Sequence, residues 1–222
     1  MEKPRAVLFD AYGTLFDVYS VSMLAEQLFP GQGQRLSTLW RDKQIEYTRL
    51  RGMAGKYKPF WGITRDALQY ACEALKLDLT EQKQSELLQA YSNLSAFPEN
   101  AAVLQALRNK GTKTGILSNG NPEMLEIAVR STNFEHLLDA VLSVDSLQTF
   151  KIHSSVYQMG LDHFGYDTAE TLFVSSNCWD VCGATWFGLS TLWVNRANLP
   201  MERLDVFPQF VGRDLTEVLS LT

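Results

Sequence analysis

The sequence predicts an α/β fold in which a doubly wound, Rossmann-like parallel sheet carries an inserted helical cap domain. After residue 98, short apolar runs alternate with helical patterns, which is typical of strand–helix–strand units. One more apolar run of strand length lies at residues 6–9. Residues 17–97, between these two regions, show helical periodicity and no convincing strand.

The length of the chain fits one domain that carries an insertion. It has 222 residues, which is more than the roughly 150 of an average domain and less than two such domains. The simplest organisation has a core of residues 1–16 and 98–222, with a cap of residues 17–97 inserted after the first strand.

The first predicted strand, at residues 6–9, ends at Asp10 and is followed by a turn. A continuous apolar run suits a strand that is buried on both faces of a parallel sheet. In the cap, Thr64 and Thr80 are the predicted N-caps of two helices. The apolar residues expected on the buried faces of the cap helices recur at helical spacing: Leu36, Leu39, Trp40, Tyr47, Leu50, Leu68, Cys72, Leu75, Leu87, Leu88 and Tyr91.

The second part of the core alternates between helices and strands. Predicted helices cover residues 99–109 and 154–164, ended by Gly111 and Gly165, and Pro122 opens another at the position that proline favours. A further helix follows the strand that ends at residue 174. The predicted strands lie at residues 114–117, 140–144, 172–174, 191–194 and 210–211.

Composition and charge exclude several classes of function. With 25 acidic and 20 basic residues the net charge is −5, so a nucleic-acid partner is not expected. No run approaches the roughly 18 apolar residues of a membrane span, and no signal peptide is recognisable. Three cysteines, Cys72, Cys178 and Cys182, fit a reducing compartment, so the expected location is the cytoplasm. An anionic substrate needs a local cationic site in such an acidic protein.

Polar residues gather where the predicted strands end. In an open parallel sheet ligands bind beyond the carboxyl ends of the strands. Any one of these residues alone is better explained as a turn former or helix cap, but four clusters that converge in the fold predict a functional site. The residues are Asp10 with Thr14, Ser118 with Asn119, Lys151 after the strand at 140–144, and Ser175 with Asn177 and Asp180.

These clusters resemble the four motifs of the haloacid dehalogenase superfamily over essentially the whole chain. Residues 9–15 (FDAYGTL) are similar to the nucleophile loop of that superfamily. Residues 117–120 (LSNG), Lys151 and residues 175–180 (SSNCWD) match the other three motifs. The resemblance implies the fold predicted above and a hydrolase that works through a covalent aspartyl intermediate.

Tyr12 points to one branch of the superfamily. Most members are magnesium-dependent phosphohydrolases with a second aspartate two residues after the nucleophile, which protonates the departing alkoxide. Tyr12 stands at this position, and a phenol cannot replace a carboxylic acid near neutral pH. A halide leaves as a stable anion and needs no proton. The sequence therefore resembles the L-2-haloacid dehalogenases, which are understood to work without metal, and no metal or other cofactor is expected.

The resemblance also implies roles in the reaction. Asp10 attacks C2 of the substrate and forms an ester with inversion, and Lys151 neutralises Asp10. Thr14 and Ser175 orient Asp10 and Lys151. Ser118 and the backbone after Asp10, at Ala11 and Tyr12, bind the substrate carboxylate. The residues expected to position the water that hydrolyses the ester are Asn177 and Asp180, supported by Tyr157.

The departing halide is expected on the side opposite Asp10. The resemblance assigns it to Arg41, in the cap helix, together with Asn119. Without the resemblance, a solvated surface arginine is the favoured interpretation of Arg41. Ile45, one turn beyond Arg41, and the aromatic residues Phe60 and Trp179 complete the expected binding site, and for the two aromatics simple core packing is the alternative.

Two positions depart from the pattern of the family. Ile152 and His153 follow Lys151 where proline is usual, so the sequence does not determine how far the Lys151 side chain extends into the site. His153 itself is interpreted as a solvated loop residue. Asp42 lies beside Arg41, where it either points into the site and narrows the substrate range or points outward as a surface charge.

The expected function is hydrolytic dehalogenation of short L-2-haloacids to D-2-hydroxyacids, with a small haloacid and the released halide as partners. The resemblance also implies a homodimer. A magnesium-dependent phosphatase is the first alternative, and Tyr12 argues against it. A catalytically silent binding member is the second. It is disfavoured because a protein without activity would be free to lose any of the four motif residues, and all of them are present: Asp10, Lys151, Asn177 and Asp180.

Overall fold

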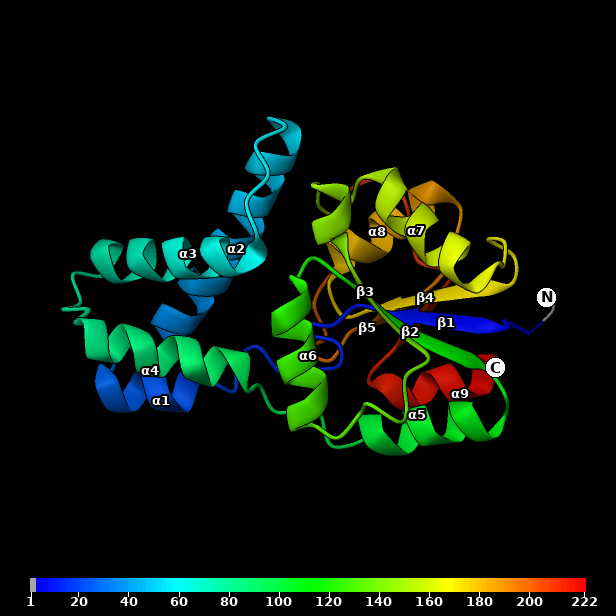
Figure 1. Cartoon of the computed structure of the whole chain (residues 1–222), viewed down its shortest axis with the longest axis horizontal. Coiled ribbons are helices and arrows are strands. Elements are labelled where there is room, and N and C mark those ends of the chain that lie inside the picture. Colours follow the sequence, from blue (N-terminus) through cyan, green and yellow to red (C-terminus); the bar gives the residue numbers. More distant parts are fainter. Residues whose placement is uncertain (1–2) are drawn as a thin grey trace.

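The computed structural model describes residues 3–222 as an α/β core beside a helical region (Figure 1). Six parallel strands form one sheet in the order β3-β2-β1-β4-β5-β6. This arrangement confirms the predicted doubly wound fold. The strands are β1 (Ala6–Phe9), β2 (Lys113–Ser118), β3 (Ala140–Ser143), β4 (Thr171–Ser175), β5 (Ser190–Val194) and β6 (Phe210–Gly212).

Helices cover both faces of the sheet (Figure 1). α5 (Asn100–Asn109), α6 (Pro122–Ser131) and α9 (Val218–Leu221) lie on one face, and α7 (Ser154–Phe164) and α8 (Cys178–Phe187) lie on the other. Two 3-10 turns, η1 (Val144–Leu147) and η2 (Leu215–Glu217), complete the core. The strand predicted at residues 140–144 is one residue too long, because Val144 begins η1.

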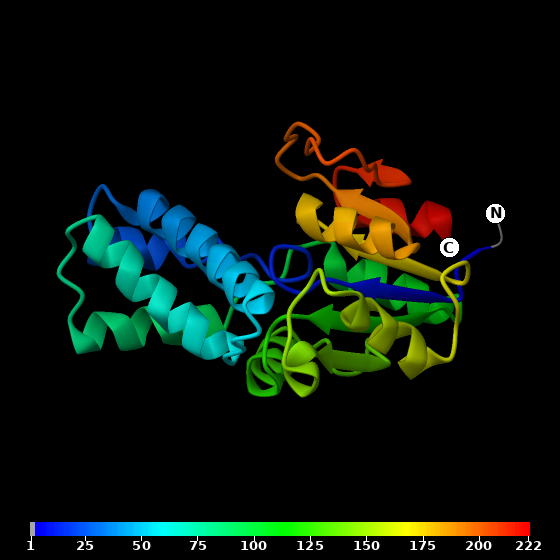
Figure 2. The same cartoon turned by 90° about the horizontal axis from the view of Figure 1, so that it is seen from above.

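The inserted segment forms four helices that lie beyond one end of the sheet (Figure 2). They are α1 (Ser22–Leu28), α2 (Gly33–Met53), α3 (Phe60–Ala74) and α4 (Glu81–Ser92). The predicted cap at Thr80 is confirmed, because its side chain accepts a hydrogen bond from the backbone N–H of Lys83. Of the described residues, none belongs to a helix long and apolar enough to cross a membrane.

Two predictions for these helices are wrong. Thr64 is not an N-cap: α3 begins at Phe60, directly after Pro59, and Thr64 lies inside it. Its buried hydroxyl accepts a hydrogen bond from the side chain of Gln44 instead. Leu50 is 54% exposed although it shares a helical face with the buried Leu36. The reason is visible in Figure 1, where the second half of α2 extends past α3.

The register of the sheet brings the predicted site together. Phe9 of β1 lies beside Ile116 of β2 and Val174 of β4. The residues that follow these three positions therefore meet at the carboxyl edge of the sheet, which is where ligands bind in such folds. The segments entering and leaving the helical region also run side by side, since the N–H of Asp17 donates to Ser95 and the N–H of Phe97 donates to Leu15.

Candidate active site

Asp10 follows β1 and is held by three donors. Its carboxylate is buried, at 5% exposure. One oxygen, Oδ2, accepts from the hydroxyl of Thr14 at 3.1 Å and from Nδ2 of Asn177 at 2.8 Å. The other, Oδ1, lies 3.0 Å from Nζ of Lys151. The donors come from three different loops, so the carboxylate has one fixed orientation.

Lys151 lies between two carboxylates. Its Nζ is 3.0 Å from Oδ1 of Asp10 and 2.7 Å from Oδ2 of Asp180, and all three side chains are buried. Burial alone lowers the pKa of Lys151, but the charges of the two aspartates outweigh it and raise that pKa above its ordinary value. Lys151 therefore stays a cation at the centre of the site.

Asp180, in the first turn of α8, is a carboxylate with an unusual affinity for protons. Burial raises the pKa of Asp180 to about 6, and the charge of Lys151 offsets part of that effect. The hydroxyl of Tyr157 donates to Oδ1 of Asp180 at 2.8 Å. Burial and the charge of Asp180 raise the pKa of Tyr157 well above its ordinary value, so this phenol is a fixed neutral donor.

The departure from the family pattern after Lys151 does not shorten its reach, since its Nζ contacts both aspartates. Its backbone N–H donates to Oδ1 of Asn119 at 2.9 Å, which orients that amide. His153 is exposed and caps α7, where its Nδ1 accepts from the N–H of Ser155. It takes no part in the site.

Arg41 reaches the core from α2. It is 8% exposed, and its Nη2 donates to the backbone oxygen of Tyr12 at 3.1 Å and lies 3.5 Å from Oδ1 of Asn177. A surface arginine is therefore the wrong interpretation. Asp42 is exposed on another side of the same helix, so of its two alternatives the outward surface charge is the one observed.

The side chain of Tyr12 belongs to an aromatic cluster. Its ring stacks on Phe60 at 5.8 Å and on Tyr91 at 6.0 Å between centroids, and all three are buried. Burial raises the pKa of Tyr12 well above its ordinary value, so it is neutral at any physiological pH. Ile45 is half-buried one turn after Arg41 on α2.

The remaining predicted residues lie around this centre. Ala11 is fully buried in the loop after β1, and Ser118 is fully buried at the end of β2, where its hydroxyl accepts from the N–H of Gly120. The indole N–H of Trp179 is shielded from solvent and has no hydrogen-bond partner among the described residues. The guanidinium of Arg49 lies 5.1 Å from the centre of the Trp179 ring.

Ser175 is fully buried at the end of β4. Its hydroxyl accepts from the N–H of Asn177 at 3.1 Å, and within residues 3–222 it makes no hydrogen bond to Asp10 or Lys151. Ser176 was not among the predicted site residues, yet its N–H donates to the hydroxyl of Thr14 at 2.8 Å and so fixes a partner of Asp10. Its position inside the fourth motif, residues 175–180, could have marked it as a site residue.

The atoms that could hold a magnesium ion are already engaged by donors. The carboxylates of Asp10 and Asp180 are the groups at this edge that could hold a cation, and the backbone oxygen of Tyr12 lies beside Asp10, since Nδ2 of Asn177 donates to both. Lys151 binds both carboxylates, and Arg41 and Asn177 donate to the Tyr12 oxygen. No group of three His, Cys, Asp or Glu side chains suited to a metal occurs in the part of the chain that the structure describes. The donor set suits an anion.

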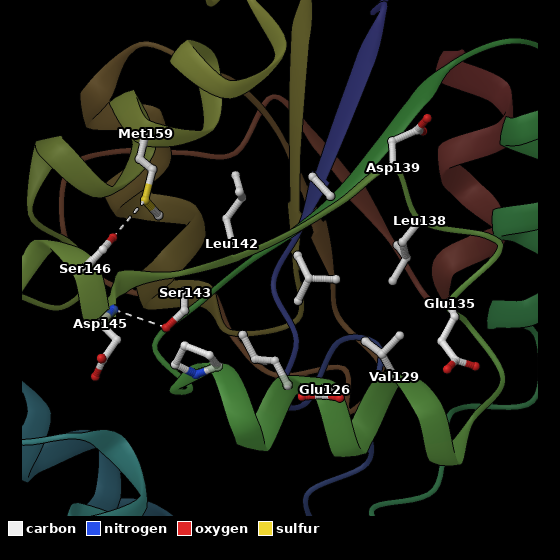
Figure 3. Close-up of a pocket in the computed structure, with 14 residues that line it drawn as sticks. Glu126, Val129, Glu135, Leu138, Asp139, Leu142, Ser143, Asp145, Ser146 and Met159 are labelled. Atoms are coloured by element: carbon white, nitrogen blue, oxygen red, sulfur yellow. Dashed lines mark hydrogen bonds between the residues drawn. The ribbon is translucent and has the colours of Figure 1, made fainter.

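Two cavities bear on the choice of site. One, of about 730 Å³, opens beside β3 and α6 and contains none of the predicted site residues. Figure 3 shows Glu126, Glu135, Asp139 and Asp145 around it, and this acidic lining would repel an anion. The other, of about 560 Å³, has two of the predicted site residues, Lys151 and Trp179, in its lining, and Asp10 is not part of that lining.

Comparison with known proteins finds relatives in the family that the sequence resembles. A family model described as haloacid dehalogenase-like hydrolase matches residues 4–188. The (S)-2-haloacid dehalogenase of Pseudomonas sp. (strain YL) is 40% identical over 221 residues, which cover 100% of this chain and 95% of the relative. Haloacetate dehalogenase H-2 of Moraxella sp. (strain B) is 41% identical over 221 residues, covering 100% of this chain and 99% of the relative.

Solved structures agree with these relatives. A crystal structure of an L-2-haloacid dehalogenase superposes with a TM-score of 0.96 at 54% identity and covers 99% of this chain and 98% of that one. The L-2-haloacid dehalogenase from Xanthobacter autotrophicus, solved with chloropropionic acid covalently bound, gives a TM-score of 0.91 at 37% identity. In that comparison 98% of each chain is covered.

Proposed function

Because the chain belongs to the haloacid dehalogenase-like hydrolase family, we propose that it hydrolyses L-2-haloacids to D-2-hydroxyacids through an ester on Asp10. One observation carries the proposal. Asp10 is an oriented carboxylate beside the buried cation Lys151, and cationic or amide donors engage the atoms that a magnesium ion would need. Such a site can attack a small monoanion without a metal to relieve charge repulsion.

In the first half-reaction, a carboxylate oxygen of Asp10 attacks C2 of the haloacid from the side opposite the halogen. The carbon–oxygen bond forms as the carbon–halogen bond breaks, and the electron pair leaves with the halide. Arg41 and the NH₂ group of Asn119 stabilise the halide. Ser118 and the backbone N–H groups at Ala11 and Tyr12 bind the carboxylate of the substrate. This geometry inverts C2 and so turns an L-haloacid into a D-hydroxyacid.

In the second half-reaction, water attacks the ester carbonyl of Asp10. Asp180 accepts the proton of that water and returns it to the departing alkoxide of the product. Its pKa of about 6 suits both steps, because the carboxylate is ionised near neutral pH yet still binds a proton readily. Tyr157 and Lys151 hold Asp180 from two sides, and Asn177 positions the water.

The leaving group argues against the phosphatase alternative. A phosphomonoester releases an alkoxide that needs a proton, and the residue two positions after Asp10 is Tyr12. Its phenol is buried among aromatic rings, and the raised pKa makes it a poor acid. A halide needs only charge stabilisation, which Arg41 supplies. The silent alternative is equally disfavoured, because Asp10, Lys151 and Asp180 form one intact hydrogen-bonded set.

The test is halide release from (S)- and (R)-2-chloropropionate in the presence of a chelator, run beside p-nitrophenyl phosphate with magnesium. We expect chloride from the (S)-acid alone and no appreciable phosphate. Magnesium-dependent phosphate release without halide release would overturn the proposal.

The organisation of the chain belongs to the same proposal. We infer that residues 17–97 act as a cap over a catalytic core of residues 1–16 and 98–222, because Arg41 reaches Tyr12 from α2. The resemblance supports a homodimer, which light scattering after size-exclusion chromatography would test. The free thiols Cys72, Cys178 and Cys182 support a cytoplasmic location.

A further inference from the structure

Three helices of the inserted region are joined by a chain of buried polar side chains near Arg41. Gln44 of α2 and Thr64 of α3 are fully buried, and Tyr91 of α4 is buried as well. The Gln44 amide links the other two, because its Nε2 donates to the hydroxyl of Thr64 at 2.9 Å and its Oε1 accepts from the hydroxyl of Tyr91 at 3.2 Å. Both ends of the amide have a partner, so its orientation is fixed.

The ring of Tyr91 connects this chain to the loop after β1. It stacks on the ring of Tyr12 with 6.0 Å between centroids, and it packs on the ring of Trp40 at 5.1 Å. The indole N–H of Trp40 donates to the backbone oxygen of Thr64 at 2.8 Å. Tyr91 is therefore held through its ring and through its hydroxyl.

Arg41 lies between the groups that Tyr91 contacts. It precedes Gln44 by three residues on α2, so the two side chains leave the helix on one face. Its Nη2 donates to the backbone oxygen of Tyr12, on whose ring Tyr91 stacks. Burial raises the pKa of Tyr91, and the positive charge of Arg41 opposes that effect because the guanidinium lies near the hydroxyl.

Packing alone does not account for the Tyr91 hydroxyl. A phenylalanine would keep the ring contacts with Tyr12 and Trp40 and would avoid the cost of burying a polar group. The hydroxyl places an oxygen near a buried guanidinium. Because its proton is donated to Gln44, the lone pairs of that oxygen are free to face a cation.

We propose that Tyr91, oriented by Gln44, is a positioning residue that holds the Arg41 guanidinium in place for the departing halide. The inference rests on the proposed dehalogenation, in which Arg41 stabilises that halide. Tyr91 should therefore matter in the first half-reaction, where the carbon–halogen bond breaks. Chloride is smaller than bromide and is stabilised more strongly by hydrogen-bond donors, so a displaced guanidinium should slow the departure of chloride more.

Two variants test the chain and a third is the control. Tyr91→Phe removes the hydroxyl and keeps the ring. Gln44→Met replaces the amide by an apolar side chain of similar length, so the hydroxyl loses the partner that orients it. Tyr70→Phe is the matched control, because it removes a phenol hydroxyl from α3 where the residue is 41% exposed.

The experiment uses the full chain in excess over (S)-2-chloropropionate or (S)-2-bromopropionate, so that halide release in a single turnover reports the first half-reaction. We expect Tyr91→Phe to slow chloride release by about 10-fold and bromide release by only about 2-fold. Gln44→Met should shift the two rate constants in the same direction, and Tyr70→Phe should leave both as in wild type. The ratio of the two rate constants does not depend on how much of a variant folds, so it separates positioning from a loss of stability.

The bromide-to-chloride ratio decides the outcome. A ratio equal to that of wild type in Tyr91→Phe or Gln44→Met, whether both rate constants stay the same or fall together, would overturn the inference and leave the dehalogenase proposal standing. An equal rise of the ratio in Tyr70→Phe would overturn it too. If wild type released no halide from either acid, both proposals would be contradicted.

Discussion

Tyr12 shows how one residue distinguishes two kinds of leaving group in the same site. The position two residues after the nucleophile carries a phenol that stacks between Phe60 and Tyr91. This side chain contributes shape and apolar surface, and its raised pKa removes it from proton transfer. Its backbone oxygen has a separate task, since it accepts hydrogen bonds from Arg41 and Asn177.

Replacing Asp10 by asparagine should abolish turnover, because an amide oxygen is a far weaker nucleophile than a carboxylate. We expect kcat to fall by roughly 10⁴-fold or more. A single turnover of wild type in heavy-oxygen water should place the heavy oxygen in the carboxylate of Asp10 and leave the hydroxyacid unlabelled, because the oxygen of the product comes from Asp10. Heavy oxygen appearing directly in the hydroxyacid would mean that water attacks C2 itself, and Asp10 would then not be the nucleophile.

The pH dependence of the second half-reaction should report the pKa of Asp180. Burial raises that pKa from 3.8 to about 6, so the side chain is a base above pH 6 and carries a proton below it. In the ester Asp10 no longer carries the charge that helps to raise this pKa, so ester hydrolysis in single turnovers should slow as the pH falls below about 6, and Asp180→Asn should let the ester accumulate. A rate that stays constant from pH 8 down to pH 5 would assign the proton transfer to another group.

At the scale of elements, α2 is the helix of the inserted region that carries Arg41, the residue that we propose takes part in the reaction. Its apolar residues Leu36 and Trp40 are buried as the helical pattern predicts. The helical pattern could not indicate where α2 extends past α3, so Leu50 was wrongly expected on the buried face of the helix. It also could not show that Pro59 starts α3 early, which leaves Thr64 inside a helix as a partner of Gln44.

Arg41 and Asp42 offer a paired test on that helix. Arg41→Lys should lower kcat by about 10²-fold, because one ammonium cannot contact the Tyr12 oxygen and face the halide as the guanidinium does. Asp42→Asn should change kcat by less than about 2-fold, since a lone exposed charge contributes little. Steady-state kinetics on (S)-2-chloropropionate compares them, and a larger effect at Asp42 would place its carboxylate in the site.

For the whole molecule, the strand-end residues could be predicted because parallel strands end at the same edge. Asp10, Lys151 and Asp180 meet as the motifs imply. The way in which the helical region packs against the core could not be predicted, because it depends on side chains that look like ordinary loop or helix residues. Asn100 is fully buried and donates to the backbone oxygen of Leu15, in the segment of the core that leads into the helical region, and no pattern in the sequence marks it.

Arg196, just after β5, joins the core to both segments that lead to the cap. Its guanidinium lies 2.5 Å from Glu99, donates to the backbone oxygen of Thr14 and lies 3.8 Å from the centre of the Phe97 ring. The Arg196 and Glu99 side chains are each 20% exposed. Hydrogen bonds to charged groups that are partly shielded contribute more than those at an open surface.

Arg196→Met should therefore reduce the free energy of unfolding by about 1.5–3 kcal/mol, because Glu99 loses its cation and Thr14 loses a donor. The control is Arg5→Met. Arg5 also pairs with a glutamate, Glu170, but its side chain is 61% exposed, so its removal should change the stability little. Urea unfolding of the two variants makes the comparison. Equal urea midpoints for the two variants would mean that the contacts of Arg196 do not stabilise the fold. A lower midpoint for Arg196→Met alone would mean that its contacts with Glu99 and Thr14 do.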